Sequence, residues 1–132
     1  MFYRPVRVLI VDDTPIIRAV VRRTLSSDGR FDVVGEAANG LEAIAHAEVH
    51  LPNLVLLDLA MPEMDGLEAL PLLLATPAAP RVIVLSAFSP DQMAEQAVHA
   101  GACAYLEKSR LATDLVPGIL TVLEGVTRSA GR

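Results

Sequence analysis

Five residues that could do chemistry stand at or just after the ends of short apolar runs. They are Asp12, Asp13, Asp58, Ser86 and Lys108. Carboxylate oxygens suit Mg²⁺, which usually takes one or two carboxylates and keeps several waters. An ammonium group and a small hydroxyl suit the oxygens of a phosphoryl group, whose transfer depends on positioning and on neutralising charge. If the fold brings them together, these residues predict phosphoryl chemistry assisted by a divalent cation.

Each of these residues alone also has a structural explanation. An Asp after a strand often starts a turn or caps a helix, so Asp12 or Asp13 could cap a helix that begins near Pro15. Grouped carboxylates, however, repel one another unless a cation is present. Lys108 is the single lysine beside ten arginines, which fits a site that needs a compact ammonium group and equally fits a general preference for arginine in this chain. The group as a whole therefore favours the functional interpretation.

The apolar runs alternate with helical patterns along the chain. The runs are 6–11, 31–35, 54–57, 82–85 and 102–106, and the helical patterns are 15–25, 40–49, 65–75, 90–100 and the segment from 113 onward. This alternation predicts a parallel sheet with right-handed crossovers and helices on both faces. Ligands of such sheets bind outside the carboxyl ends of the strands, where all five residues would converge.

Composition excludes several classes of protein. The 132 residues are enough for one domain, and 52% hydrophobic against 20% charged residues argues against disorder. A net charge of −5 argues against direct nucleic-acid binding. A lone cysteine, Cys103, excludes an internal disulfide and a Cys-cluster zinc site. Neither a membrane span nor a signal peptide is evident, so we expect a cytoplasmic location.

Four segments in this order resemble the receiver domain of bacterial two-component response regulators, including the chemotaxis regulators. They are residues 8–13, 56–66, 85–87 and 101–108, and the resemblance spans residues 6–126. It implies a flavodoxin-like, doubly wound α/β fold, with a five-strand parallel sheet in the order 2-1-3-4-5 and helices on both faces. We expect a receiver domain at 1–126, followed by a tail or the start of a linker at 127–132.

The resemblance also implies a role for each site residue. Asp58 would accept a phosphoryl group from a histidine kinase or a phosphotransfer protein. Mg²⁺ would be held by Asp12, Asp13, Asp58 and the backbone carbonyl of Ala60. Lys108 would bind a phosphoryl oxygen.

Two further residues, Ser86 and Tyr105, would form the switch that changes the surface of the last two helices and last strand. Such a protein would catalyse only its own phosphorylation and slow dephosphorylation. Its expected partners are the kinase, an output domain or target protein, and a second copy of itself when phosphorylated.

Two alternatives remain open. An Asp-nucleophile phosphohydrolase would need a second Asp two residues beyond Asp58, where the chain has Ala60. A receiver-like interaction module that is never phosphorylated would not need the complete residue set. The chain also departs from the family pattern after the lysine, where Ser109 replaces the usual proline.

Residues outside this set are expected to have ordinary roles. His46 and His50 are four residues apart and could share a helix face, but we expect surface side chains. Cys103 is expected to be buried. Three arginines of the first helix are expected to form a solvated face or a kinase-docking surface; they are Arg18, Arg22 and Arg23.

Overall fold

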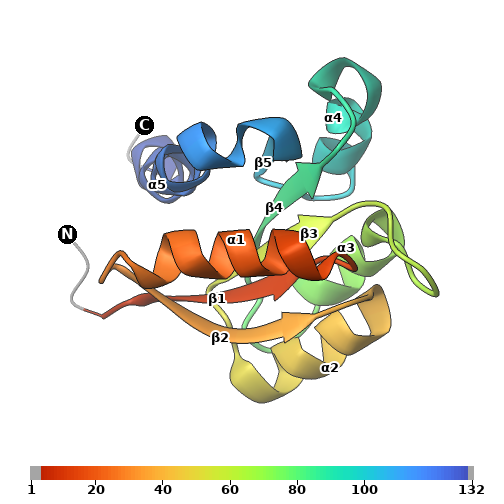
Figure 1. Ribbon diagram of the computed structural model, residues 1–132, viewed down its shortest axis with the longest axis horizontal. Helices are drawn as coiled ribbons and strands as arrows, with labels where there is room; N and C mark the ends of the chain where they lie inside the picture. Colours follow the sequence, from red (N-terminus) through yellow and green to blue (C-terminus); the bar gives the residue numbers. More distant parts are fainter. Residues whose placement is uncertain (1–3, 131–132) are drawn as a thin grey trace.

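The computed structural model describes the backbone of residues 4–130 and the side chains of residues 4–124. Strands and helices alternate from one end to the other (Figure 1). The strands are β1 (Val6–Val11), β2 (Phe31–Ala37), β3 (Leu54–Asp58), β4 (Arg81–Ser86) and β5 (Ala104–Glu107). The helices are α1 (Pro15–Ser26), α2 (Gly40–His50), α3 (Gly66–Leu74), α4 (Pro90–His99) and α5 (Leu111–Ala130), with a 3₁₀ turn at Lys108–Arg110.

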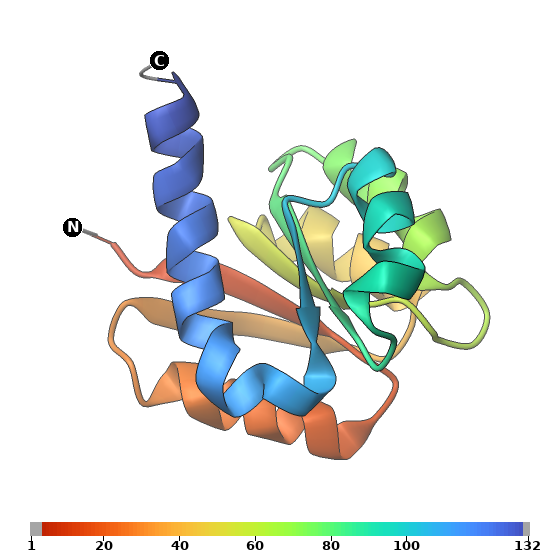
Figure 2. The same cartoon turned by 90° about the horizontal axis from the view of Figure 1, so that it is seen from above.

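The strands form one parallel sheet in the order β2-β1-β3-β4-β5, which confirms the predicted fold class. Helices α1 and α5 cover one face of the sheet, and α2, α3 and α4 cover the other (Figure 2). Because both faces are covered, the inner strands are apolar almost throughout, and β3 is buried at all five positions.

Side chains of the strands point alternately to two separate cores. Val8 and Ile10 of β1 enter the α1/α5 core, whereas Leu9 and Val11 enter the α2–α4 core. The helices supply the α1/α5 core with Val21, Leu25, Leu111, Leu115, Ile119 and Val122. They supply the α2–α4 core with Ala43, Ala47, Ala69, Leu70, Leu73 and Ala97.

Short polar signals set the helix starts that position the loops. Helix α4 begins as predicted, with Pro90 at its first position and the Ser89 N–H donating to Oε1 of Gln92 at 3.1 Å. Helix α3 begins after Asp65, whose side chain accepts from the Glu68 N–H at 2.9 Å.

Two expectations differ from the structure. Cys103 is exposed rather than buried, because it lies in the turn that precedes β5. Helix α5 begins at Leu111 rather than 113, since the 3₁₀ turn after β5 leads directly into it. Residues 127–130 continue α5 as helix, while 131–132 lie outside the described residues; the domain boundary at 126 stays a prediction. Among the residues described, no helix is both long and apolar enough to cross a membrane.

Candidate functional site

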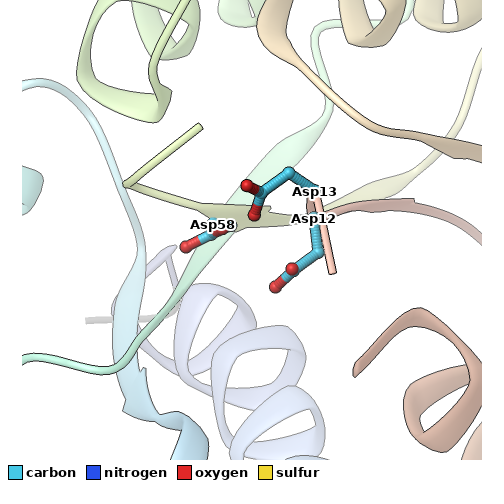
Figure 3. A group of neighbouring side chains, drawn as sticks. All are labelled: Asp12, Asp13 and Asp58. Carbon is cyan, nitrogen blue, oxygen red and sulfur yellow. The ribbon is translucent and has the colours of Figure 1, made fainter. Parts of the chain in front are cut away.

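The carboxyl edge of the sheet gathers the acidic residues. Asp12 and Asp13 follow β1, and Asp58 ends β3, the neighbouring strand. One carboxylate oxygen of each lies within 4.8 Å of the others, and Figure 3 shows the three side chains side by side. Asp12 and Asp58 are only 1% and 3% exposed, whereas Asp13 is open to solvent.

Lys108 joins this cluster from the end of β5. Its Nζ lies 2.7 Å from Oδ2 of Asp12 and 3.1 Å from Oδ1 of Asp58. Burial by itself would lower the pKa of Lys108, but the two carboxylates outweigh burial and raise it. The lysine is therefore a fixed positive charge held between two buried acids.

The charge of Asp58 is only partly compensated. Burial foremost, and then the negative charge of Asp12, raise its pKa from 3.8 to about 6. Lys108 and the N–H of Ala60, which donates to Oδ1 at 3.3 Å, oppose this shift without cancelling it. The cluster contains three carboxylates and one ammonium group, so a further cation would be stabilised there.

Oxygen donors in this arrangement fit a hard divalent cation such as Mg²⁺. Two of the three carboxylates are buried and share the single positive charge of Lys108, and a buried charge is costly unless it is fully paired. A cation coordinated by the cluster would supply that pairing and leave its open side, at exposed Asp13, to water or to a substrate oxygen. That the backbone carbonyl of Ala60 also binds the cation stays a prediction.

The loop that carries Asp12 is held by α1. The N–H of Thr14 donates to Oδ1 of Asp12 at 2.8 Å, and Nη1 of Arg18 donates to the Asp12 carbonyl at 2.6 Å. Nε of Arg18 also lies 3.1 Å from Oε1 of Glu36 on β2, and Arg22 bonds the other oxygen of Glu36. The expected solvated face is thus wrong for Arg18, which is half-buried, while Arg22 and Arg23 are exposed as predicted.

The loop after Asp58 is held by two glycines. The N–H of Gly66 donates to the Leu59 carbonyl at 2.9 Å, and the N–H of Gly40 donates to the Met64 carbonyl at 3.0 Å. A Cβ at Gly66 would collide with the Asp58 carbonyl and lie 2.8 Å from Cα of Leu59. Close approach of the α3 start to β3 therefore requires glycine at this position.

The two predicted switch residues meet at the backbone of Phe88. Ser86 is buried, and its Oγ accepts from the Phe88 N–H at 3.1 Å. Tyr105 is half-buried, and its hydroxyl donates to the Phe88 carbonyl at 2.8 Å. All predicted side chains therefore lie at or beside one edge of the sheet, with Tyr105 linked to it through the loop between β4 and α4.

Sequence reasoning missed the Arg18–Glu36 pair. The pair joins α1 to β2, and its existence depends on β2 lying beside β1. A signal was present in the strand order that the resemblance implied, since that order places the end of β2 next to the start of α1.

Comparisons with known proteins agree with this geometry. The sequence model of the family "Response regulator receiver domain" matches residues 8–119. The transcriptional regulatory protein PdtaR of Mycobacterium tuberculosis is 41% identical over 130 residues, which cover 92% of this chain and 62% of PdtaR. The transcription regulator BvgA of Bordetella pertussis is 34% identical over 121 residues, covering 92% of this chain and 57% of BvgA. The chain thus spans about three fifths of the length of these relatives.

Solved structures show the same likeness. The signal receiver domain of NarL from Mycobacterium tuberculosis has a TM-score of 0.84 and 36% identity, covering 92% of this chain and 98% of that one. The response regulator domain of Thermotoga maritima CheB has a TM-score of 0.83 and 29% identity, with the same coverage. The sheet order, the match over residues 8–119 and these relatives lead to one conclusion: the chain belongs to the receiver domain family of two-component response regulators.

Proposed function

We propose that the chain is a phosphoacceptor switch in which Asp58 takes a phosphoryl group from the phosphohistidine of a kinase or phosphotransfer protein. The observation that carries this proposal is the position of Lys108, which contacts Asp12 and Asp58 at once. An ammonium group there can follow the charge as it moves from the carboxylate to the phosphoryl oxygens.

The contacts of Asp58 suggest which oxygen reacts. Lys108 and the Ala60 N–H both approach Oδ1, which leaves Oδ2 for the new bond to phosphorus. As that bond forms, the bond from phosphorus to the histidine nitrogen breaks, and the nitrogen keeps the electron pair. Ser86 is placed on the neighbouring strand, where its hydroxyl could leave the Phe88 N–H and donate to a phosphoryl oxygen.

Asp12, Asp13 and Asp58, with the Ala60 carbonyl, would hold Mg²⁺ in this proposal. When bound, the cation neutralises charge on the phosphoryl oxygens and on the carboxylates. The chain's own residues orient the acceptor: Thr14 and Arg18 hold Asp12, and the Gly66 turn holds the segment after Asp58. Chemistry is confined to phosphorylation and dephosphorylation of Asp58, since Ala60 supplies no acid or base for an external substrate.

The partners and the setting are also part of the proposal. PdtaR and BvgA are named as regulators of transcription, and the chain corresponds to about three fifths of each. We infer that phosphorylation of this receiver, in the cytoplasm, controls an output domain or a target protein. The affected surface would be formed by α4, β5 and α5, and a second copy of the chain could bind there.

Phosphorylation can be tested with acetyl phosphate and Mg²⁺, followed by intact mass. Wild type should gain the mass of one phosphoryl group, and Asp58→Asn should gain none. Asp91→Asn is the matched control, because it removes an exposed Asp in the first turn of α4. Equal labelling of wild type and Asp58→Asn, or labelling lost in Asp91→Asn, would contradict the assignment.

A further inference from the structure

A second cluster of ligating side chains lies far from the acidic edge, on the last turns of α2. The rings of His46 and His50 stack with their centroids 5.5 Å apart and their planes 30° apart. Both side chains are half-buried at the surface. With Ala45 and Val49 they line a surface hollow of about 180 Å³.

Glycine at position 35 of β2 makes room for these two rings. A Cβ there would lie 3.1 Å from Nδ1 of His46 and 3.4 Å from Cδ2 of His50. Nδ1 of His46 is buried and has no hydrogen-bond partner among the described residues. A buried nitrogen without a partner is costly, and such an atom in a native fold calls for an explanation.

We propose that His46 and His50 form a binding site for a transition-metal ion of the Zn²⁺, Ni²⁺ or Cu²⁺ class, each giving one ring nitrogen. Imidazole suits these ions, and two His four residues apart on a helix can bind one ion from the same face. Two imidazole nitrogens about 2.1 Å from one tetrahedral ion place the ring centres roughly 5 Å apart. The observed 5.5 Å is close to this spacing.

The surroundings favour this ion class over Mg²⁺. The one group of three or more clustered acidic, His or Cys ligands within the described ranges is Asp12, Asp13 and Asp58. No third acidic, His or Cys ligand of the described residues joins the two histidines. The pair therefore offers two nitrogen ligands, and water would complete the coordination of a bound ion.

Arg7 limits how strongly the site binds. Its guanidinium donates to the carbonyls of His50 and Leu51, so these oxygens are already paired and the two rings are the ligands that remain. Arg7 lies at the start of β1, whereas Asp12 follows its end, so the histidine site and the acidic cluster lie at opposite edges of the sheet. Binding at one site can therefore be measured while the other is filled.

The test is a titration of the full chain with Zn²⁺ in excess Mg²⁺, followed by NMR of the imidazole resonances. Those of His46 and His50 should shift together and saturate at one ion per chain, and those of His99 should not. His46→Gln and His50→Gln should each weaken Zn²⁺ binding about tenfold or more, because the loss of even a group that only supports a ligand weakens metal binding by that much. His99→Gln, an exposed histidine on α4, is the matched control and should bind as wild type does.

Three outcomes would overturn the proposal. They are no saturable binding, unchanged affinity in the double variant His46→Gln/His50→Gln, and shifts confined to the residues around Asp58. Thermal unfolding of each variant without Zn²⁺ shows that it is folded, and labelling by acetyl phosphate shows that the acidic site is intact. Failure of the zinc site would leave the proposed phosphorylation of Asp58 untouched, because that assay uses Mg²⁺ alone.

Discussion

Asp58 is buried next to a second acid, and the pH dependence of stability should report this. Its pKa in the folded chain is about 6, above the ordinary 3.8, so between these values the folded state binds more protons than the unfolded state. Stability from this group is therefore greatest at low pH and falls as the pH rises from about 4 to about 6. We expect Asp58→Asn, in EDTA, to melt higher than wild type at pH 7 and to lose that advantage near pH 4.

Measuring both melting temperatures between pH 4 and pH 7 gives the contribution of Asp58 together with its coupling to Asp12 and Lys108. Adding Mg²⁺ at pH 7 should narrow the difference, since the cation stabilises the carboxylate of the wild type. A difference that stays constant across the whole pH range would contradict the assigned cause.

Arg18 and Arg22 offer a matched pair for testing how Asp12 is positioned. Both bond Glu36, but only Arg18 also donates to the Asp12 carbonyl. A hydrogen bond from a charged group contributes about 1.5–3 kcal/mol to stability, and only part of that loss bears on the position of Asp12, so Arg18→Gln should weaken Mg²⁺ binding several-fold. Arg22→Gln should change it little.

Mn²⁺ binding followed by electron paramagnetic resonance, with Mg²⁺ as competitor, measures this difference directly. The rate of labelling by acetyl phosphate at low Mg²⁺ should fall in the same order. Equal effects of the two substitutions would mean that the ion pair with Glu36, rather than the contact to Asp12, supports the site.

At the residue scale, the sequence identified the side chains that chemistry requires but not the partners that hold them. Asp12, Asp58 and Lys108 were found because strand ends of a parallel sheet meet at one edge. The Arg18–Glu36 bridge and the unpaired Nδ1 of His46 depend on which residues face each other across elements. Cys103 was misplaced because its apolar neighbours suggested a strand from 102, whereas β5 begins two residues later, at Ala104.

At the scale of elements, the loop from β3 to α3 is held by close backbone contacts at Gly66. Gly66→Ala should lower the free energy of unfolding by about 1–3 kcal/mol, because the added methyl group overpacks the backbone of β3. It should also slow labelling of Asp58, whose carbonyl the methyl group would displace. Gly29→Ala is the control, since nothing lies within 4 Å of a Cβ there.

Urea unfolding of both variants, together with acetyl phosphate labelling, checks this. If Gly66→Ala were as stable and as reactive as Gly29→Ala, the close approach of α3 to β3 would be wrong.

The ends of strands and helices were predictable where neighbouring residues mark them, and less so where they depend on pairing with a distant strand. The first strand was predicted at 6–11, and Ser89-Pro90 marked the start of α4. The second strand extends to Ala37, two residues beyond the predicted end, because pairing with β1 continues to Val11. Strand β5 and helix α5 shifted by two residues, since the 3₁₀ turn between them has no strong sequence signal.

At the scale of the whole molecule, the proposed switch should couple the acidic edge to α4, β5 and α5. The Phe88 backbone links Ser86 and Tyr105. If the Ser86 hydroxyl turns toward a phosphoryl group, it leaves the Phe88 N–H without its present acceptor. Beryllofluoride with Mg²⁺, as a phosphoryl mimic, should therefore change amide exchange at Phe88 and within residues 89–125. Such a change in exchange requires two conformations of the domain, one of which binds the mimic more tightly than the other.

Hydrogen exchange with mass spectrometry, with and without beryllofluoride, measures the change. Asp58→Asn should show none, and Tyr105→Phe should retain the change near Phe88 while reducing that in β5. Identical exchange in wild type with and without the mimic would contradict the coupling.

The sheet that presents the acidic edge also separates the α1/α5 core from the α2–α4 core. Substitutions in contact with each other couple energetically, whereas distant ones without shared partners add. Changes in the two cores should therefore sum rather than compensate, and an enlarged side chain in one core cannot be relieved by a smaller one in the other. During evolution, each core is therefore expected to adjust its side chains independently of the other, while the losses in both cores add up in the one free energy of unfolding of the domain.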